Sequence, residues 1–169
     1  MRRITLITGG QRSGKSRFAE QMVLSLDSYP IYMATSRFWD DEHRRRIEKH
    51  QENRGSEWVT IEEDKKLSKH DLSGKTILID CVTLWVTNFF YDFDSDIESS
   101  LSALKKEFDS FTSQDARFVF VTNEIGLGEM SQNKLQRKFA DLQGWFNQYI
   151  ASKADEVYLM VAGISMKIK

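Results

Sequence analysis

The amino-acid sequence predicts a three-layer α/β fold, in which a mostly parallel sheet has helices on both faces. Two observations lead to this prediction. Short apolar runs alternate with longer amphipathic runs along the chain, and the runs at 76–80 (TILID) and 118–122 (FVFVT) are apolar almost throughout. Apolar strands separated by helices are typical of a parallel sheet that is covered on both sides.

Length and composition fit one globular domain over residues 1–169. The chain has 40% hydrophobic and 12% aromatic residues, the composition of a protein with a packed core. It contains a single proline, Pro30, and neither a Gly/Ser-rich linker nor an internal repeat is found. With 169 residues the chain is too short for two ordinary domains.

The first part of the chain is expected to form a strand at 4–8, a glycine loop and a helix. Apolar residues recur four positions apart from Phe18 to Leu26, which gives this helix one apolar face. A second strand is expected at 31–34. The strongly charged residues 40–54 are expected to form an exposed helix with few core contacts.

The rest of the chain continues the alternation of strands and helices. A buried strand ends in the carboxylate of Asp80, and a turn at Gly163 separates the last two strands. The strands expected in this part cover residues 58–61, 76–80, 118–122, 157–161 and 164–168, and the helices cover residues 84–91, 97–111 and 133–152.

Charge and cysteine content exclude several classes of protein. The 24 Lys and Arg residues are balanced by 25 Asp and Glu residues, so no nucleic-acid partner is expected. Cys81 is the only cysteine, which excludes an intrachain disulfide and a cysteine zinc cluster. No apolar run approaches the roughly 18 residues of a membrane span, and the N-terminal one is too short for a secretory signal. A cytoplasmic protein is therefore expected.

A phosphate-binding loop follows the first strand. Its residues match G-x-x-x-x-G-K-[ST] at every fixed position, between an apolar strand and an amphipathic helix. Glycines let the backbone N–H groups surround phosphate oxygens, the lysine reaches the β- and γ-phosphates, and the last hydroxyl binds Mg²⁺. The sequence therefore predicts a P-loop NTPase that binds a magnesium-nucleoside triphosphate through Gly9, Gly10, Gln11, Arg12, Ser13, Gly14, Lys15 and Ser16.

Asp80 is the candidate for the second magnesium ligand, next to Ser16. It closes the apolar strand at 76–80, where a P-loop enzyme carries its Walker-B carboxylate. The alternative is a helix N-cap, because Thr83 and Leu84 follow closely. The apolar run before Asp80 favours the role at the metal, since a cap alone does not need it.

The charged segment at 40–54 contains a candidate nucleophile, His50, flanked by Lys49 and Arg54. A neutral imidazole is nucleophilic near pH 7, and cationic neighbours lower its pKa and attract phosphates. Attack on an α-phosphate would give a nucleotidyl-histidine. Composition alone favours a solvated surface helix. His43 lies seven residues before His50, but without a third ligand a metal site is not expected.

With these motifs the chain resembles the bifunctional adenosylcobinamide kinase / adenosylcobinamide-phosphate guanylyltransferase family of cobalamin biosynthesis. The resemblance covers essentially the whole length. It lies in residues 8–17, 32–36, 40–42, 81–88, 121–126 and 161–167, together with Arg46, Ile47, His50, Arg54 and Trp58.

The resemblance implies two reactions with Mg²⁺ and ATP or GTP. Adenosylcobinamide is phosphorylated, and GMP from GTP is then attached to the adenosylcobinamide phosphate through a guanylyl-histidine at His50. It also implies that Thr35, Ser36 and Arg54 lie near the nucleotide and that a carboxylate, Glu62 or Asp80, reads guanine. A RecA-like sheet order and a homotrimer are implied as well.

One loop departs from the family. The common Asn-Glu-Val-Gly block is usually followed by Gly-Ile-Val-Pro, whereas this chain has Gly-Glu-Met-Ser at 128–131. Asn123 and Glu124, just before it, follow a strand and are expected at the carboxyl edge where α/β sheets bind ligands; a loop cap is the alternative for them. The aromatic residues at 85 and 89–91 suit either a corrin ring or the core.

Two other functions remain open from the sequence. One is a P-loop kinase of another small molecule, in which His50 is only a surface residue. The other is a RecA-like ATPase that acts on DNA or a protein, although the balanced charge speaks against DNA.

Overall fold

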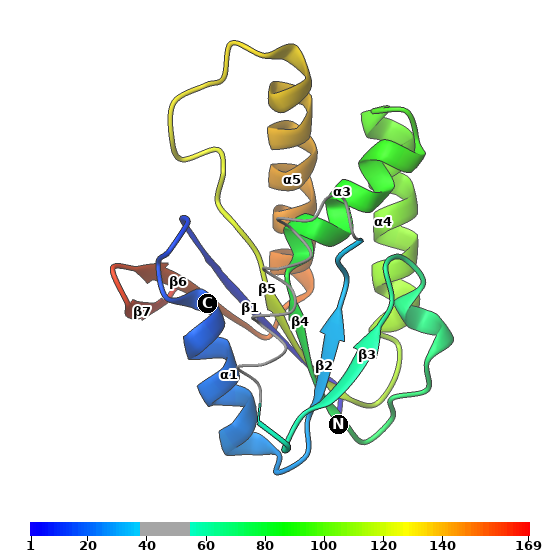
Figure 1. Ribbon diagram of the computed structural model, residues 1–169, viewed down its shortest axis with the longest axis vertical. Helices are drawn as coiled ribbons and strands as arrows, with labels where there is room; N and C mark the ends of the chain where they lie inside the picture. Colours follow the sequence, from blue (N-terminus) through cyan, green and yellow to red (C-terminus); the bar gives the residue numbers. More distant parts are fainter. Residues whose placement is uncertain (38–54) are drawn as a thin grey trace.

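The computed structural model describes residues 1–37 and 55–169. These residues form a seven-stranded sheet in the order β3-β2-β4-β5-β1-β6-β7 (Figure 1). All neighbouring strands are parallel except β6 and β7, which pair antiparallel. The strands are β1 (Arg3–Gly9), β2 (Ile31–Ala34), β3 (Val59–Glu62), β4 (Thr76–Asp80), β5 (Arg117–Val121), β6 (Glu156–Val161) and β7 (Ile164–Lys167).

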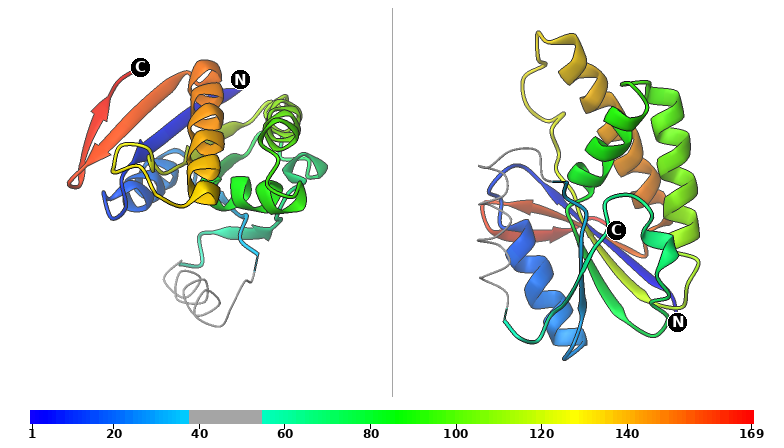
Figure 2. Two further views of the ribbon diagram at one scale, coloured as in Figure 1. Left: turned by 90° about the horizontal axis from the view of Figure 1, so that it is seen from above. Right: turned by 45° about the vertical axis from the view of Figure 1, so that its right-hand side comes forward.

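Helices cover both faces of this sheet, which confirms the predicted three-layer α/β fold (Figure 2). One face carries α1 (Lys15–Leu26), whose Ala19 and Val23 belong to the smaller of two cores. The larger core lies on the other face. It is closed by α3 (Val82–Asp92), α4 (Ile97–Phe111) and α5 (Lys134–Lys153).

The central strands are apolar on both sides because they contribute to both cores. In β4, Ile77 and Ile79 enter the larger core and Leu78 enters the smaller one, and all three are completely buried. In β5, Phe118 enters the larger core and Val119 enters the smaller one. Successive side chains of a strand point to opposite faces, so a sheet with helices on both sides needs apolar residues at every position.

The larger core is filled mainly by aromatic side chains. Phe108 of α4 lies 5.2 Å from the Phe120 ring and 6.2 Å from the Phe146 ring, and Phe146 lies 5.7 Å from Trp85. Trp85 donates its indole N–H to the carbonyl oxygen of Lys65 at 3.1 Å, so its one polar atom is satisfied. These contacts join the two long helices to the centre of the sheet and hold α3 against it.

The predicted elements agree with the structure to within about two residues, as expected for element ends that the pattern defines poorly. The expected segments 31–34, 76–80 and 97–111 coincide with β2, β4 and α4. A short 3-10 helix, η1 (Leu67–Lys69), was not predicted. The expected helix at 40–54 falls on residues 38–54, outside the described part of the chain. In the described part, no helix is both long and apolar enough to cross a membrane.

Truncation of one buried leucine is expected to measure what the larger core contributes. Leu104 of α4 is completely buried, so Leu104→Ala should lower the free energy of unfolding by about 2–5 kcal/mol. Leu24→Ala is the matched control, because Leu24 is also helical but 37% exposed; its effect should stay within about 0.5 kcal/mol. Urea unfolding followed by circular dichroism measures both. Equal losses of unfolding free energy in the two variants would contradict the assignment of Leu104 to the core and Leu24 to the surface.

Candidate nucleotide-binding site

The phosphate loop begins at the last residue of β1, where only glycine fits. A Cβ atom at Gly9 would lie 2.5 Å from the carbonyl oxygen of Met160 in β6 and 2.9 Å from the Ser13 hydroxyl. Gly9 also has a φ of 153°, and Arg12 inside the loop has a positive φ of 56°. The close approach of β6 therefore fixes the path of the chain as it leaves the sheet.

The turn between β6 and β7 supports the loop from the other side. Gly163 donates its backbone N–H to the carbonyl oxygen of Ser13 at 2.9 Å. A Cβ at Gly14, the N-cap of α1 with a φ of 94°, would lie 3.2 Å from the Cα of Gly163. Ala162 and Gly163 both have positive φ, as a tight two-residue hairpin turn requires. The sequence predicted a turn at Gly163, but not that this turn packs on the phosphate loop.

Lys15 lies across this loop at the start of α1. Its ammonium donates to the carbonyl oxygen of Gly10 at 2.6 Å, and its Nζ is 3.4 Å from the Ser13 hydroxyl. The residue is only 7% exposed. Burial lowers the pKa of Lys15, and the nearby carboxylate of Asp80 partly offsets this. The cation is thus held over the loop, where phosphate oxygens would replace the Gly10 carbonyl as its partners.

The sheet order brings Asp80 to the phosphate loop. Asp80 is the last residue of β4, and a single strand, β5, separates β4 from β1. The Asp80 carboxylate raises the pKa of Lys15, against the larger lowering by burial, so its charge acts on the ammonium. The N-cap of α3 is Cys81 and not Asp80, which argues against the cap alternative. Asp80 therefore lies where a carboxylate can help to bind a metal at the phosphates.

Ser16 is the other predicted magnesium ligand. It lies in the first turn of α1, directly after Lys15, and is half-buried. Within residues 1–37 and 55–169, no group of three or more His, Cys, Asp or Glu side chains is arranged to hold a metal ion by itself. One hydroxyl and one carboxylate fit the P-loop pattern, in which Mg²⁺ has few protein ligands and is held mainly by phosphates and water.

Thr35 and Ser36 follow β2 at the same edge of the sheet. Thr35 is completely buried, and its hydroxyl donates to the carbonyl oxygen of Cys81 at 3.1 Å. Its own carbonyl accepts from the Asn88 amide at 2.7 Å, so Thr35 joins β2 to α3. The Ser36 hydroxyl donates to the carbonyl oxygen of Arg37 at 3.1 Å. Glu62, exposed at the end of the edge strand β3, lies farther from the phosphate loop.

Asn123 and Glu124 lie against the phosphate loop and α3. A Glu124 carboxylate oxygen accepts from the Thr8 hydroxyl at 2.6 Å, and the Glu124 N–H donates to the carbonyl oxygen of Gly9 at 3.1 Å. The Asn123 amide donates to the hydroxyl of Thr83 in α3 at 3.0 Å. Both residues follow β5 at the carboxyl edge of the sheet, as expected, where Glu124 is bonded to the end of β1 and Asn123 to α3.

A buried polar network holds these two residues in place. The Thr122 hydroxyl donates to Asn147 Oδ1 at 2.7 Å, and Gln143 Nε2 donates to both groups at 2.8 and 2.9 Å. Asn147 Nδ2 donates to the carbonyl oxygen of Asn123 at 3.1 Å. Sequence reasoning missed Gln143 and Asn147, although amides four residues apart on the inner face of α5 are an available signal.

The sequence comparisons decide which family of P-loop proteins this is. The family described as cobinamide kinase / cobinamide phosphate guanyltransferase matches residues 5–168. The chain belongs to this family. It is 38% identical to the bifunctional adenosylcobalamin biosynthesis protein CobU of Escherichia coli (strain K12), over 97% of this chain and 98% of that protein. The protein of the same name from Salmonella typhimurium (strain LT2) is 37% identical over the same shares.

The fold agrees with this assignment. The solved structure of the flagellar accessory protein FlaH from Methanocaldococcus jannaschii is similar with a TM-score of 0.50, over 99% of this chain and 78% of that one. Its sequence identity is only 12%, so the likeness concerns the fold alone. This member of the cobinamide kinase family therefore has the RecA-like sheet that the resemblance implied. One strand, β5, lies between the P-loop strand β1 and the strand β4, which ends in Asp80.

Arg37 holds the start of the charged segment in this member of the cobinamide kinase family. Its guanidinium donates to both carboxylate oxygens of Asp92 at 2.7 and 2.8 Å and to Asp64 at 2.5 Å. Lys65 also binds Asp92 at 2.7 Å. A bidentate arginine pair of this kind is well oriented. The chain therefore enters residues 38–54 from the ends of β2 and α3.

Three predicted histidine and arginine positions fall inside that segment. His50, the candidate nucleophile, and Arg54 lie outside the described residues, as does His43. The other residues predicted for the nucleotide site belong to the carboxyl edge of the sheet, at the ends of β1, β2, β3 and β4. The structure therefore brings the phosphate loop, Thr35, Ser36 and Asp80 together, with Glu62 at the outer end of the same edge.

Two glycines of the loop are expected to differ in their tolerance of a methyl group. Gly9→Ala should weaken nucleotide binding by about tenfold or more, because the new Cβ would collide with the Met160 carbonyl and displace the loop. A Cβ at Gly10 would meet no atom within 4 Å, so Gly10→Ala should change affinity by less than about threefold. Calorimetric titration with GTP and Mg²⁺ measures both. Equal losses would mean that the collision at Gly9 is not the controlling contact.

Proposed function

We propose that this chain catalyses both reactions of its family. The γ-phosphoryl group of ATP or GTP is transferred to the aminopropanol hydroxyl of adenosylcobinamide. GMP from GTP is then joined to that phosphate, which gives adenosylcobinamide-GDP and pyrophosphate. The observation that carries the proposal is a supported phosphate loop with Asp80 two strands away at the end of β4, in a chain that matches its bifunctional relatives over 97% of its length. Residues 1–169 act as one catalytic domain.

In the kinase step, the chain mainly positions and neutralises phosphate. Backbone N–H groups from Gly9 to Gly14 surround the phosphate oxygens, and Lys15 balances the charge that builds up on the transferred group. Mg²⁺, held through Ser16 and Asp80, supplies further neutralisation when bound. The substrate hydroxyl attacks the γ-phosphorus as the bond to the β–γ bridging oxygen breaks, and its proton leaves to solvent or to a nearby carboxylate.

In the guanylyl step, His50 is the nucleophile. A neutral imidazole nitrogen attacks the α-phosphorus of GTP, the bond to the α–β bridging oxygen breaks, and pyrophosphate leaves. A phosphate oxygen of adenosylcobinamide phosphate then attacks the same phosphorus, and the P–N bond breaks to release the histidine. The anchoring of Arg37 by Asp64 and Asp92 supports this role, because it starts the segment that carries His50 at the nucleotide edge.

The order of the strands favours one carboxylate, Asp80, for binding Mg²⁺ and the other, Glu62, for recognising guanine. Asp80 on β4 is two strands from the P-loop strand β1, and Glu62 on β3 is four strands away. Neighbouring strands are about 4.8 Å apart, so Glu62 lies roughly 20 Å from the loop and Asp80 roughly half as far. We assign Asp80 to the metal side and Glu62 to the guanine N1–H and N2–H₂ groups, with Arg54 near the nucleotide.

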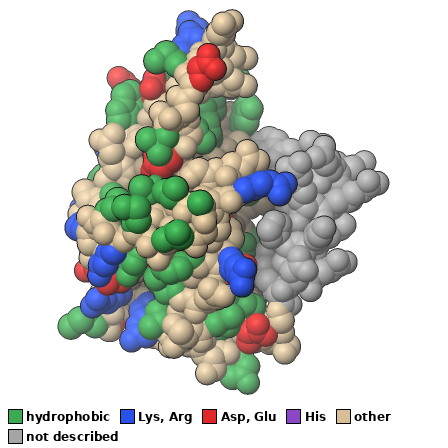
Figure 3. All heavy atoms as spheres, turned by 90° about the vertical axis from the view of Figure 1, so that its left-hand side faces the viewer, with side chains coloured by type: hydrophobic (Ala, Val, Ile, Leu, Met, Phe, Trp, Pro, Cys, Tyr) green, Lys and Arg blue, Asp and Glu red, His purple; other side chains and the backbone are tan. Residues whose placement is uncertain are grey.

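The enzyme is proposed to work as a homotrimer in the cytoplasm, where ATP and GTP are available. The exposed apolar side chains at the β6–β7 edge support self-association. Figure 3 shows hydrophobic side chains gathered on the face that carries these strands. At these strands, Val161, Ile164, Met166 and Ile168 are each more than half exposed. An antiparallel edge strand with such side chains is a ready surface for another copy.

Labelling with α-³²P-GTP and Mg²⁺ is expected to reveal the covalent intermediate. The wild type should retain label after denaturation, stable in base and labile in acid, because a phosphoramidate forms at histidine. His50→Asn should retain none. His43→Asn is the matched control and should be labelled like the wild type, since His43 does not match the family position. A folded, GTP-binding wild type without label would exclude the guanylyl-histidine.

Two carboxylate variants are expected to distinguish the residue that binds Mg²⁺ from the residue that recognises guanine. Asp80→Asn should slow turnover with both ATP and GTP by about 100-fold, with a loss of stability below about 1 kcal/mol. Glu62→Gln should raise the KM for GTP by about tenfold and leave the KM for ATP unchanged, because only guanine offers the N1–H and N2–H₂ donors. Initial rates over a range of Mg²⁺ concentrations measure both. The reverse pattern would exchange the two assignments.

A further inference from the structure

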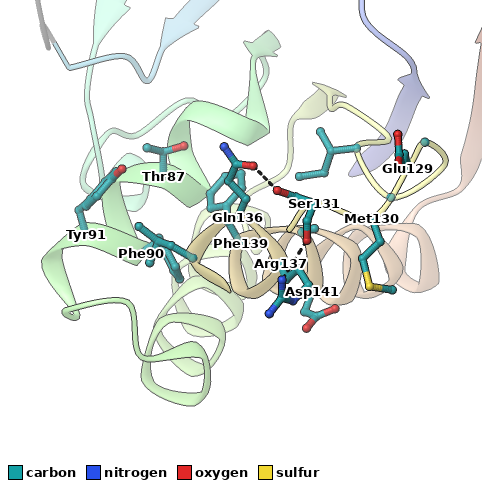
Figure 4. A pocket seen from close by; sticks show the side chains of 15 residues that line it. Thr87, Phe90, Tyr91, Glu129, Met130, Ser131, Gln136, Arg137, Phe139 and Asp141 are labelled. Atoms are coloured by element: carbon teal, nitrogen blue, oxygen red, sulfur yellow. Dashed lines mark hydrogen bonds between the residues drawn. The ribbon is translucent and has the colours of Figure 1, made fainter. Parts of the chain in front are cut away.

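A large pocket lies between α3, the loop after β5 and the first half of α5. It has a volume of about 760 Å³, within the range of small-molecule sites. Figure 4 shows side chains of α3, of the loop after Glu124 and of the first half of α5 around it. Its apolar lining comes mainly from Phe90, Tyr91, Ile125, Met130, Leu135 and Phe139.

We propose that this pocket binds the corrin ring of adenosylcobinamide; this inference rests on the proposed function. A corrin ring presents broad apolar faces, and aromatic and aliphatic side chains suit them. Of the aromatic residues at 85 and 89–91, Trp85, Phe89 and Phe90 are at most 5% exposed and belong to the core, but Tyr91 is 51% exposed. Tyr91 is therefore the aromatic of this group that is available to a ring, and Phe90 also lines the pocket.

The position of the pocket suits a substrate that must reach the γ-phosphate. Its loop wall begins at Ile125, next to Glu124, which binds Thr8 and Gly9 at the start of the phosphate loop. On the helical wall, the hydroxyl of Thr87 donates to the carbonyl oxygen of Thr83, the residue that accepts from Asn123. A ring in the pocket can therefore direct its aminopropanol arm across Asn123 and Glu124 toward Lys15.

The charges at the pocket also fit this ligand. Cobalt(III) bound to a monoanionic corrin ring and an adenosyl carbanion leaves one net positive charge. Glu129 and Asp141 line the pocket with carboxylates. The guanidinium of Arg137, which also lines it, donates to the carbonyl oxygens of Ser131 and Gln132 at 2.9 and 2.7 Å. Arg137 keeps its charge in these bonds, so Glu129, Asp141 and Arg137 together leave one net negative charge at the pocket, which complements the cationic ligand.

The loop that walls the pocket is the one that departs from the family pattern. Asn133 caps α5 by accepting from the N–H of Leu135 at 2.8 Å, and the Ser131 hydroxyl binds the side chain of Gln136. The Asn133 N–H donates to the Ser131 hydroxyl at 3.1 Å. Ser131, where the family commonly has proline, therefore contributes bonds that shape the pocket in this chain.

Introducing a cation into the pocket is expected to separate corrinoid binding from nucleotide binding. Leu135 is 42% exposed and Met130 is 79% exposed, so arginine at either position should leave the fold intact. Leu135→Arg and Met130→Arg should each raise the KM for adenosylcobinamide by about tenfold and weaken its binding in equilibrium dialysis equally. The Kd for GTP and the labelling from α-³²P-GTP should be unchanged.

Leu26→Arg is the matched control, because Leu26 is 47% exposed on α1, away from the pocket, and should change none of these quantities. Unchanged corrinoid affinity in both pocket variants, with an active wild type, would overturn the assignment. Pocket variants with altered sedimentation but unaltered corrinoid affinity would also overturn the assignment. They would indicate that the pocket binds a second copy of the chain. A wild type that neither binds nor phosphorylates adenosylcobinamide would overturn the proposed function together with the pocket.

Discussion

The packing of the phosphate loop against the β6–β7 hairpin is the constraint on which the site depends. The Gly163 N–H binds the Ser13 carbonyl, and the Met160 carbonyl lies where a Cβ at Gly9 would be. The loop is therefore shaped by a strand pair from the other end of the chain as well as by its own glycines. A loop whose path is fixed before nucleotide binds loses less conformational entropy when the phosphates arrive.

The order of the strands places the residues proposed for phosphate, metal and guanine binding at different distances from this loop. Moving from β1 across β5 to β4 leads from the phosphates to Asp80, and moving on through β2 to β3 leads to Glu62. The corrinoid pocket proposed above lies elsewhere, between α3, α5 and the loop after β5. In the proposed arrangement, nucleotide and corrinoid would approach the γ-phosphate from different directions, so that one phosphate loop could serve two substrates.

The elements around the site are held by buried polar groups as much as by apolar packing. Asn88 donates to the carbonyl oxygens of Thr35 and Asp64, and Asn147 donates to that of Asn123. Inside a protein such bonds are strong when they are satisfied and costly when they are not, so they specify one arrangement of loops. The aromatic core behind them packs α3, α4 and α5 together on one face of the sheet.

The sequence by itself determined the fold class, most element positions and the phosphate loop, because these follow from local periodicity and from residue types at fixed spacing. Tertiary structure alone decided that a single strand separates β1 from β4, which ends in Asp80, that Gly163 packs on the loop and that Asn147, bonded to Gln143, holds Asn123. It also decided that Tyr91 reaches a pocket while Trp85 fills the core, although both are aromatic residues of one helix. The reason is physical: strand order and the face that a side chain presents depend on contacts between distant segments, which no local pattern contains.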